Sequence, residues 1–410
     1  MGSKCWSIWS PPSRKGKPLP ADSILELPLD SKWKQSFRQR LRRWYGKHRR
    51  ELPWRKTRDP YAVWVSEIML QQTQVETVRP YFERFMSAFP TVTALAEVKQ
   101  EEVLRLWEGL GYYRRARQMH DAARKIAVEL DGVFPQTVAA LQQLPGVGRY
   151  TAGAIVSIAF DQPAPILEAN TIRLLSRVLG YRKDPTKTPG QKLLWAMAGE
   201  ILPRKNVADF NQALMELGSL VCRPSSPICD DCPIQTQCAA CQAGLQSKIP
   251  VPKRKKPLTD LHEVAVVVTK NKSVLLRQCA EGERWAGLWD FPRFEMAATL
   301  KEPSSVCSNR PPSTDHEIDH VVHDEIVEKV HALTGITCLP GTLLQTIKHG
   351  VTRYRITLDC YTAQYALGRI RPRAAKPVRW TPVGELGNYA LSTTGRKIAR
   401  SIAIREKDAS

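Results

Sequence analysis

The sequence predicts an all-α domain followed by an α+β domain, and three observations predict that order. From Trp33 to about Gly244, apolar residues recur three and four apart between Gly and Pro breaks, which is typical of short packed helices. Residues 247–258, SKIPVPKRKKPL, interrupt this pattern with prolines and a basic run, as a linker does. After them, short β-branched and apolar runs surround a helical segment, so the second domain mixes strands and helix.

The chain length supports this division, because 410 residues can bury two separate cores. We expect four parts in chain order: a flexible tail at 1–30, a helical domain at 31–245, a basic linker at 246–260 and an α+β domain at 261–405. Pro, Ser and Asn accumulate at 299–319, where we expect a disordered insertion.

Individual elements follow from local patterns. Asp59-Pro60 offers a helix cap followed by a proline suited to a first turn, and YAVWVSEIMLQQTQVETV continues as the predicted helix. In the second domain we expect strands at EVAVVVT, SVLLRQ and RYRITLDCYTA, and a helix at HDEIVEKVHALTG.

The charge balance favours a polyanionic partner. Lys and Arg number 61 against 40 Asp and Glu, which leaves a net charge of +21. Phosphate backbone is the simplest partner for such a chain, although charge alone does not separate nucleic acid from an anionic membrane. We find no apolar run of about 18 residues and no secretory signal at the start, so we expect a cytoplasmic protein without a membrane partner.

Five of the ten cysteines crowd into one short segment. The spacing Cys222-x6-Cys229-x2-Cys232-x5-Cys238 lets one loop wrap a single metal ion or a cubane cluster with soft thiolate ligands. A zinc knuckle and an iron–sulfur cluster both remain open on spacing alone. The role of Cys241 also stays open.

A glycine-rich turn precedes an apolar helix at residues 144–156, LPGVGRYTAGAIV. Gly146 and Gly148 leave backbone N–H groups unhindered at the helix N-terminus, an arrangement that suits a phosphate oxygen. A simple tight turn between two helices is the alternative interpretation.

Together these segments resemble the MutY adenine glycosylases of the helix-hairpin-helix superfamily. The resemblance rests on LPGVG, the cysteine spacing, LPWRKTRDPY with SEIMLQQTQV, GLGYYRRARQ and FNQALMELGSLVC, and GLWDFP with a Nudix-like remainder extends it to nearly the whole chain. It implies an all-α helix-hairpin-helix glycosylase domain with an iron–sulfur cluster loop at 222–238, plus an α+β Nudix-like domain. A monomer, a 4Fe-4S cluster and double-stranded DNA containing A:8-oxoguanine or A:G mispairs are the implied assembly state, cofactor and partner.

The resemblance also implies two catalytic carboxylates, since cleavage of an N-glycosidic bond needs an acid and a stabilising negative charge. Glu67, inside apolar VWVSEIML, matches the residue that protonates adenine; an ordinary helix-surface Glu is the alternative. The family's Asp is replaced by Glu168 in PILEANTIRLLSR, while Asn170 is kept. Because a misplacement of about 1 Å can cost on the order of a hundredfold in rate, the longer side chain puts the rate in doubt. An ordinary acid at a helix N-terminus is the alternative for Glu168.

Tyr150 stands where related endonuclease III-like enzymes carry a lysine that forms a Schiff base. The chain should therefore lack that lyase activity, and Tyr150 should form a hydrogen bond near the catalytic carboxylate. A core aromatic residue is the alternative.

The resemblance assigns the remaining residues to DNA. Gln72 and Thr73 probe the oxidised guanine, and Tyr112 intercalates beside it with help from Leu110. The adenine pocket is lined by Trp54, Arg55, Leu70 and Gln212, any of which could instead belong to the core.

In the second domain, IKHGVTRYRITL places His349 where the family's recognition loop ends in His, but Lys348 replaces its serine. The metal-binding Nudix core R-E-x-x-E-E is missing from HDEIVEKVHALTGI, so we expect no pyrophosphate hydrolysis. Two other functions stay open: an endonuclease III-like glycosylase/lyase, and a catalytically idle DNA-binding module.

Overall fold

The computed structural model describes residues 29–251, 257–296, 315–370 and 377–408. The expected tail up to residue 28, linker residues 252–256 and the expected insertion up to residue 314 lie outside this part of the chain. The chain divides into two compact units, residues 1–49 with 163–253 and residues 50–162 with 254–410. The helical segment therefore contributes to both units.

The first unit is helical around a single core. It contains α1 (Ser31–His48), α9 (Ala169–Leu179), α10 (Thr188–Glu200), α11 (Val207–Leu220), the 3-10 helix η3 (Gln235–Gln237) and α12 (Ala239–Gln242). Helix α11 packs against both α1 and α9. The core between them is apolar and includes Phe37, Leu41, Leu175, Val178, Phe210, Leu214 and Leu217.

The second unit begins with a group of helices. These are η2 (Pro53–Arg55), α2 (Pro60–Leu70), α3 (Val75–Ala88), α4 (Val92–Glu97), α5 (Gln100–Trp107), α6 (Arg114–Glu129), α7 (Val138–Leu141) and α8 (Arg149–Phe160). Helices α2 and α8 pack against each other, and both are buried along most of their length. Their sequences are apolar on all sides, as expected for helices at the centre of a bundle.

Helix α2 starts as predicted but ends early. The Asp59 carboxylate accepts hydrogen bonds from the backbone N–H groups of Tyr61 and Ala62, and Pro60 occupies the first turn. The expected continuous helix is wrong beyond Leu70, because Gln72 adopts a left-handed backbone conformation with φ of 59°. A turn therefore separates α2 from α3 and projects as a loop.

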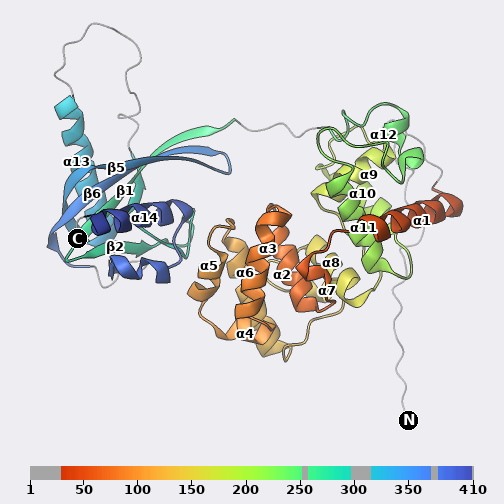
Figure 1. The fold of residues 1–410 in the computed structure, drawn as a ribbon, viewed down its shortest axis with the longest axis horizontal. Coiled ribbons are helices and arrows are strands. Elements are labelled where there is room, and N and C mark those ends of the chain that lie inside the picture. Colours follow the sequence, from red (N-terminus) through yellow and green to blue (C-terminus); the bar gives the residue numbers. More distant parts are fainter. Residues whose placement is uncertain (1–28, 252–256, 297–314, 371–376, 409–410) are drawn as a thin grey trace, which may run out of the picture. The chain divides into compact units, whose positions relative to one another are not determined.

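The second unit also contains a seven-stranded mixed sheet (Figure 1). Its strands are β1 (Thr259–Lys270), β2 (Ser273–Gln278), β3 (Trp289–Asp290), β4 (Arg293–Glu295), β5 (Ile336–Val351), β6 (Tyr354–Gly368) and β7 (Val378–Pro382). The order is β3-β2-β1-β6-β5, with β4 paired to β1 and β7 to β2. Only the β1–β6 pair is parallel among these strand pairs. The three expected strands are confirmed.

Two helices cover opposite faces of this sheet, and η5 (Val383–Asn388) precedes the second of them. Strand β1 alternates between the faces: Val266 packs toward α13 (Asp315–Thr334), and Val267 packs toward α14 (Thr393–Asp408). The helix expected at HDEIVEKVHALTG is confirmed as part of α13, which already begins within the expected insertion. Within the described residues, no helix is both long and apolar enough to cross a membrane.

Candidate active site and nucleic-acid interface

The structure brings Glu67 and Tyr150 into direct contact. Glu67 lies on α2 with only 5% of its surface exposed, between buried apolar neighbours. Tyr150 is the second residue of α8, and its hydroxyl donates a hydrogen bond to Glu67 Oε2. Packing of α2 against α8 therefore places a carboxylate and a phenol together in a largely apolar setting. The helix-surface alternative for Glu67 does not fit this burial.

The turn before α8 contains Gly146 and Gly148, and its geometry requires glycine only at Gly146. Gly146 has a φ of 74°, and a Cβ there would lie 2.8 Å from Gln118 Cβ. Gly148 is the N-cap of α8 and would meet nothing if it carried a Cβ. Gly148 offers no side-chain cap to α8, and the absence of a side chain there keeps the start of the helix sterically accessible.

Glu168 belongs to the first unit, where it is the N-cap of α9. Its carboxylate accepts hydrogen bonds from the N–H groups of Asn170 (2.7 Å) and Thr171 (2.9 Å). Burial raises the pKa of Glu168, and these two N–H groups offset part of that rise. Asn170 in turn accepts a hydrogen bond from Arg173. The structure thus places Glu168 as a helix-terminal acid, and its longer side chain folds back onto its own helix.

The cysteines line one small cavity of the first unit. Cys222, Cys229, Cys232, Cys238 and Cys241 surround about 350 Å³ of space, part of it open to solvent, together with Leu174, Arg177, Val221, Ile228 and Ile234. Arg177 donates a hydrogen bond to Cys222 Sγ at 3.2 Å. Burial raises the pKa of Cys229 and of Cys238 to about 11 and that of Cys232 to about 12. Burial therefore favours the protonated form of these three thiols, and a bound cation would favour their thiolates.

Two loops of the second unit carry the residues expected to probe DNA. Gln72 and Thr73 lie between α2 and α3, and Leu110 and Tyr112 lie between α5 and α6. Gln72 and Tyr112 both have positive φ, at 59° and 50°. The Tyr112 side chain is 48% exposed, whereas Leu110 is buried. The Tyr112 ring is therefore accessible from solvent, whereas the Leu110 side chain is packed inside the protein.

The expected adenine-pocket residues divide between the two units. Trp54 is buried on η2 with its ring against Phe82, which fits a core role as well as a pocket wall. Arg55 donates a hydrogen bond to the Arg50 carbonyl, and Leu70 is the half-buried last residue of α2. The fourth residue, Gln212, lies on α11 in the first unit and accepts a hydrogen bond from the Tyr45 hydroxyl at 3.0 Å.

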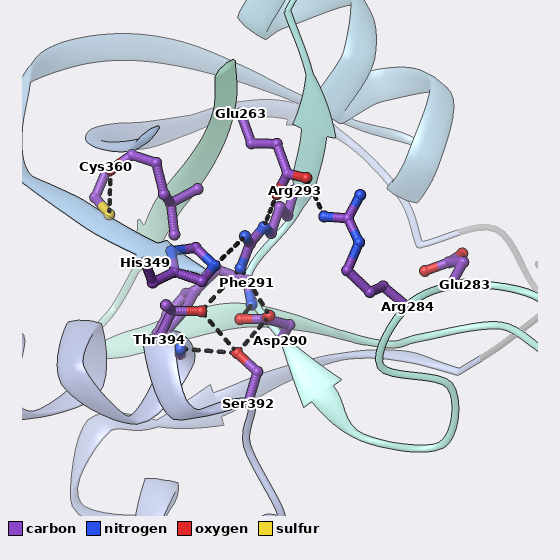
Figure 2. A network of polar contacts seen from close by, with 12 residues as sticks. Glu263, Glu283, Arg284, Asp290, Phe291, Arg293, His349, Cys360, Ser392 and Thr394 are labelled. Atoms are coloured by element: carbon purple, nitrogen blue, oxygen red, sulfur yellow. Dashed lines mark hydrogen bonds and ion pairs between the residues drawn. The ribbon is translucent and has the colours of Figure 1, made fainter. Parts of the chain in front are cut away.

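His349 lies within β5, two residues before the turn to β6, and joins a buried polar network (Figure 2). Its Nε2 lies 3.3 Å from Arg293 Nη2, which must be the donor. Burial lowers the pKa of His349, as suits a neutral ring that accepts this hydrogen bond. Lys348 is exposed on the neighbouring position.

Sequence reasoning missed the rest of this network. The Glu263 carboxylate accepts hydrogen bonds from Arg284 and Arg293, and the Arg293 guanidinium lies 4.1 Å from the ring centroid of Trp285. Asp290 is fully buried and accepts a hydrogen bond from Ser392. The available signal was the position of Glu263 directly before the apolar run 264–268 of β1, since a buried carboxylate requires a partner.

Comparisons with known proteins agree with both parts of the fold. Residues 65–199 match the family model described as HhH-GPD superfamily base excision DNA repair protein, and residues 263–401 match a NUDIX domain model. The adenine DNA glycosylase of Mus musculus is 36% identical over 421 residues, covering 89% of this chain and 77% of the mouse protein. The chain belongs to the adenine DNA glycosylase family.

The chain is also similar to other glycosylases. The protein from Buchnera aphidicola subsp. Schizaphis graminum is 38% identical over 260 residues, covering 63% of this chain and 75% of the Buchnera protein. A solved thermostable thymine-DNA glycosylase is 28% identical with a TM-score of 0.48, covering 52% of this chain and 98% of that chain. The predicted resemblance and the predicted fold class are confirmed.

Proposed function

We propose that this chain hydrolyses the N-glycosidic bond of adenine mispaired with 8-oxoguanine or guanine in double-stranded DNA. The observation that carries the proposal is the buried contact between Glu67 and Tyr150 in a chain of the adenine DNA glycosylase family. The basic balance of the chain fits a DNA partner, since +21 net charge favours phosphate backbone. We further propose that it acts as a monomer in the cytoplasm, on the nucleoid.

Glu67 is the proposed general acid. Departure of adenine requires a proton on the leaving base, and a carboxyl group in an apolar site holds a proton more readily than one in water. Tyr150 orients the Glu67 carboxyl by donating a hydrogen bond to its Oε2. Because position 150 carries a phenol and no amine, no Schiff base forms there, and the enzyme is monofunctional.

Glu168 is the proposed source of negative charge for the oxocarbenium ion. Its carboxylate already accepts two backbone hydrogen bonds at the start of α9, which hold its charge in place. Asn170 is fixed beside it through Arg173. The extra methylene relative to aspartate is accommodated by this capping geometry, so we expect a reduced rate without loss of activity.

A 4Fe-4S cluster is the proposed cofactor, held by Cys222, Cys229, Cys232 and Cys238. Four cysteines of one loop around a shared cavity fit the ligand set of a 4Fe-4S cluster, with a zinc knuckle as the alternative. Bound there, the cluster supplies structural cross-linking of the loop and no reaction step. The Arg177 hydrogen bond to Cys222 suits a thiolate ligand.

The second domain is the proposed reader of the oxidised guanine, and the Arg293 network around His349 supports that assignment. The network fixes the His349 ring, and exposed Lys348 is free to contact phosphate. We propose no pyrophosphate hydrolysis for this domain, since the metal-binding carboxylates of a Nudix box are absent from HDEIVEKVHALTGI.

Single-turnover release of adenine tests the proposal. The rate of adenine release should be highest opposite 8-oxoguanine, lower opposite guanine and lowest opposite cytosine. Borohydride added during the reaction should trap no covalent adduct under conditions that trap a control lyase. A trapped adduct would favour the endonuclease III-like alternative, and absence of release from all three duplexes would contradict the proposed activity.

A further inference from the structure

One half-buried arginine connects the two DNA-probing loops. Arg115, in the first turn of α6, reaches the loop between α2 and α3 with one terminal nitrogen and the loop between α5 and α6 with the other. Nη1 donates to the carbonyls of Ile68, Met69 and Gln71, and Nη2 lies within hydrogen-bonding distance of Thr73 Oγ1 and of the Leu110 and Gly111 carbonyls. The four hydrogens on these two nitrogens are shared among six acceptors on two separate segments, a reach that few single side chains have.

Two of these acceptors directly precede the residues with left-handed backbone. Gln71 comes before Gln72, and Gly111 comes before Tyr112. A non-glycine residue with positive φ costs on the order of 1–3 kcal/mol and persists only where its surroundings hold it. By binding the carbonyl of each preceding residue, Arg115 holds the two peptide planes that turn into these conformations.

Aromatic contacts and the helix end strengthen the arrangement. The Arg115 guanidinium lies 5.4 Å from the ring centroid of Trp107 and 5.5 Å from that of Tyr112. Trp107 also donates a hydrogen bond to the Gly111 carbonyl at 3.1 Å. The Ile68 and Met69 carbonyls belong to the last turn of α2, whose negative end favours a cation.

We propose that Arg115 is a positioning residue that fixes both probing loops as one rigid unit, and that its loss impairs extraction of a stacked adenine while sparing hydrolysis of an unpaired one. This inference rests on the proposed function. The polar contacts of Arg115 are to the end of α2 and to the two loops, so its effect should be confined to insertion of Gln72 and Tyr112 into the duplex. Since a base must leave the stack before its bond can break, loosened loops slow that earlier step.

The test compares two duplexes of identical sequence under single-turnover conditions. One carries adenine opposite 8-oxoguanine, and the other carries adenine opposite a stable abasic analogue, where the adenine has no pairing partner. We expect Arg115→Met to slow release from the first duplex on the order of a hundredfold, as for an angstrom-scale misplacement, and from the second by less than about threefold. Arg115→Lys should fall between, because one ammonium cannot span both loops.

Arg124→Met is the matched control, since Arg124 lies exposed on the same helix and the substitution removes the same charge. It should leave both rates unchanged. Tyr112→Ala should reproduce the selective loss, and combining it with Arg115→Met should add little. Equal slowing of Arg115→Met on both duplexes, or no slowing on either, would overturn the inference.

A fluorescence measurement of base unstacking tests the role of Arg115 independently of the proposed adenine release. With 2-aminopurine in place of the target adenine, its increase in fluorescence on binding reports unstacking without any bond cleavage. If the parent protein unstacks the base but releases no adenine, the proposed activity fails and the role of Arg115 is still measured. An undiminished fluorescence increase with Arg115→Met would contradict the positioning role.

Discussion

The hydroxyl of Tyr150 donates a hydrogen bond to the buried carboxyl of Glu67, across the contact between α8 and α2. The two residues are 83 positions apart in the chain, so the contact depends on the fold of the second unit. A residue that accepts or carries a proton benefits from a fixed orientation, because catalysis is sensitive to small displacements. Tyr150 therefore orients Glu67, the proposed general acid. As a phenol, Tyr150 cannot itself form a Schiff base.

Removal of the Tyr150 hydroxyl should slow adenine release while leaving the fold intact. A hydrogen bond to a group that carries charge contributes about 1.5–3 kcal/mol, so Tyr150→Phe should reduce the single-turnover rate about 10- to 100-fold. Tyr61→Phe is a matched control on α2, since its hydroxyl is also buried and donates to the Phe89 carbonyl at 2.8 Å. It should lower stability without changing the rate. If Tyr150→Phe released adenine as fast as Tyr61→Phe, the Tyr150 hydroxyl would take no part in catalysis.

The pKa of Glu168 should appear in the pH dependence of stability. Burial raises this pKa above its ordinary value of 4.5, so folding favours the protonated carboxyl. Its contribution to stability is fully present below about pH 4.5 and is lost as pH rises through the raised pKa. Relative to Glu168→Gln, the parent should therefore lose free energy of unfolding as the pH rises above about 4.5.

Urea unfolding of both proteins at matched pH values measures this difference. Glu97→Gln serves as control for the loss of one carboxyl group, because Glu97 is exposed at the end of α4. A parent that gains stability relative to Glu168→Gln over the same range would contradict the direction of the shift.

Serine substitution should show that four of the five cysteines are cluster ligands and that the fifth, Cys241, is not. Serine at Cys222, Cys229, Cys232 or Cys238 should reduce iron content and visible absorbance, since each thiolate supplies one ligand. Cys241→Ser should retain both. Iron loss confined to a set that includes Cys241 would mean that the spacing has been assigned to the wrong four ligands, and stoichiometric zinc in the purified protein would favour the knuckle.

Lesion preference should depend on His349 more than on Lys348. His349→Ala removes the acceptor for Arg293 Nη2 in the network of the second domain, and should lower the ratio of release opposite 8-oxoguanine to release opposite guanine. Lys348→Ala should weaken binding to all duplexes alike, as loss of a phosphate contact does. Kd and single-turnover rates on the two duplexes distinguish these effects. A changed ratio with Lys348→Ala alone would reverse the assignment.

Local signals predicted the elements well where sequence periodicity was strong. The cap at Asp59, the strand that contains Val266 and the glycine turn at Gly146 all follow from short-range rules, and the structure confirms them. The early end of α2 did not follow, because the left-handed backbone at Gln72 is held by Arg115, 43 positions away.

The site was harder to predict than the fold for the same reason. Glu67 was recognisable from its apolar neighbours, but its partner on α8 required the family pattern. The capping of α9 by Glu168 is local and matches the helix N-terminal alternative given for that residue. The pairing of Glu263 with Arg293, 30 positions apart, depends on a contact that only the folded chain creates. Such long-range polar contacts leave no periodic trace in the sequence.

The most direct test of the central claim is Glu67→Gln, which removes the proton donor and keeps the size of the side chain. Single-turnover release from A:8-oxoguanine duplex and Kd for the same duplex should be measured together, with iron content as a check on folding. We predict loss of adenine release with DNA affinity retained. Undiminished release would show that Glu67 is not the general acid, and a parent protein that binds but releases nothing would leave only a DNA-binding role.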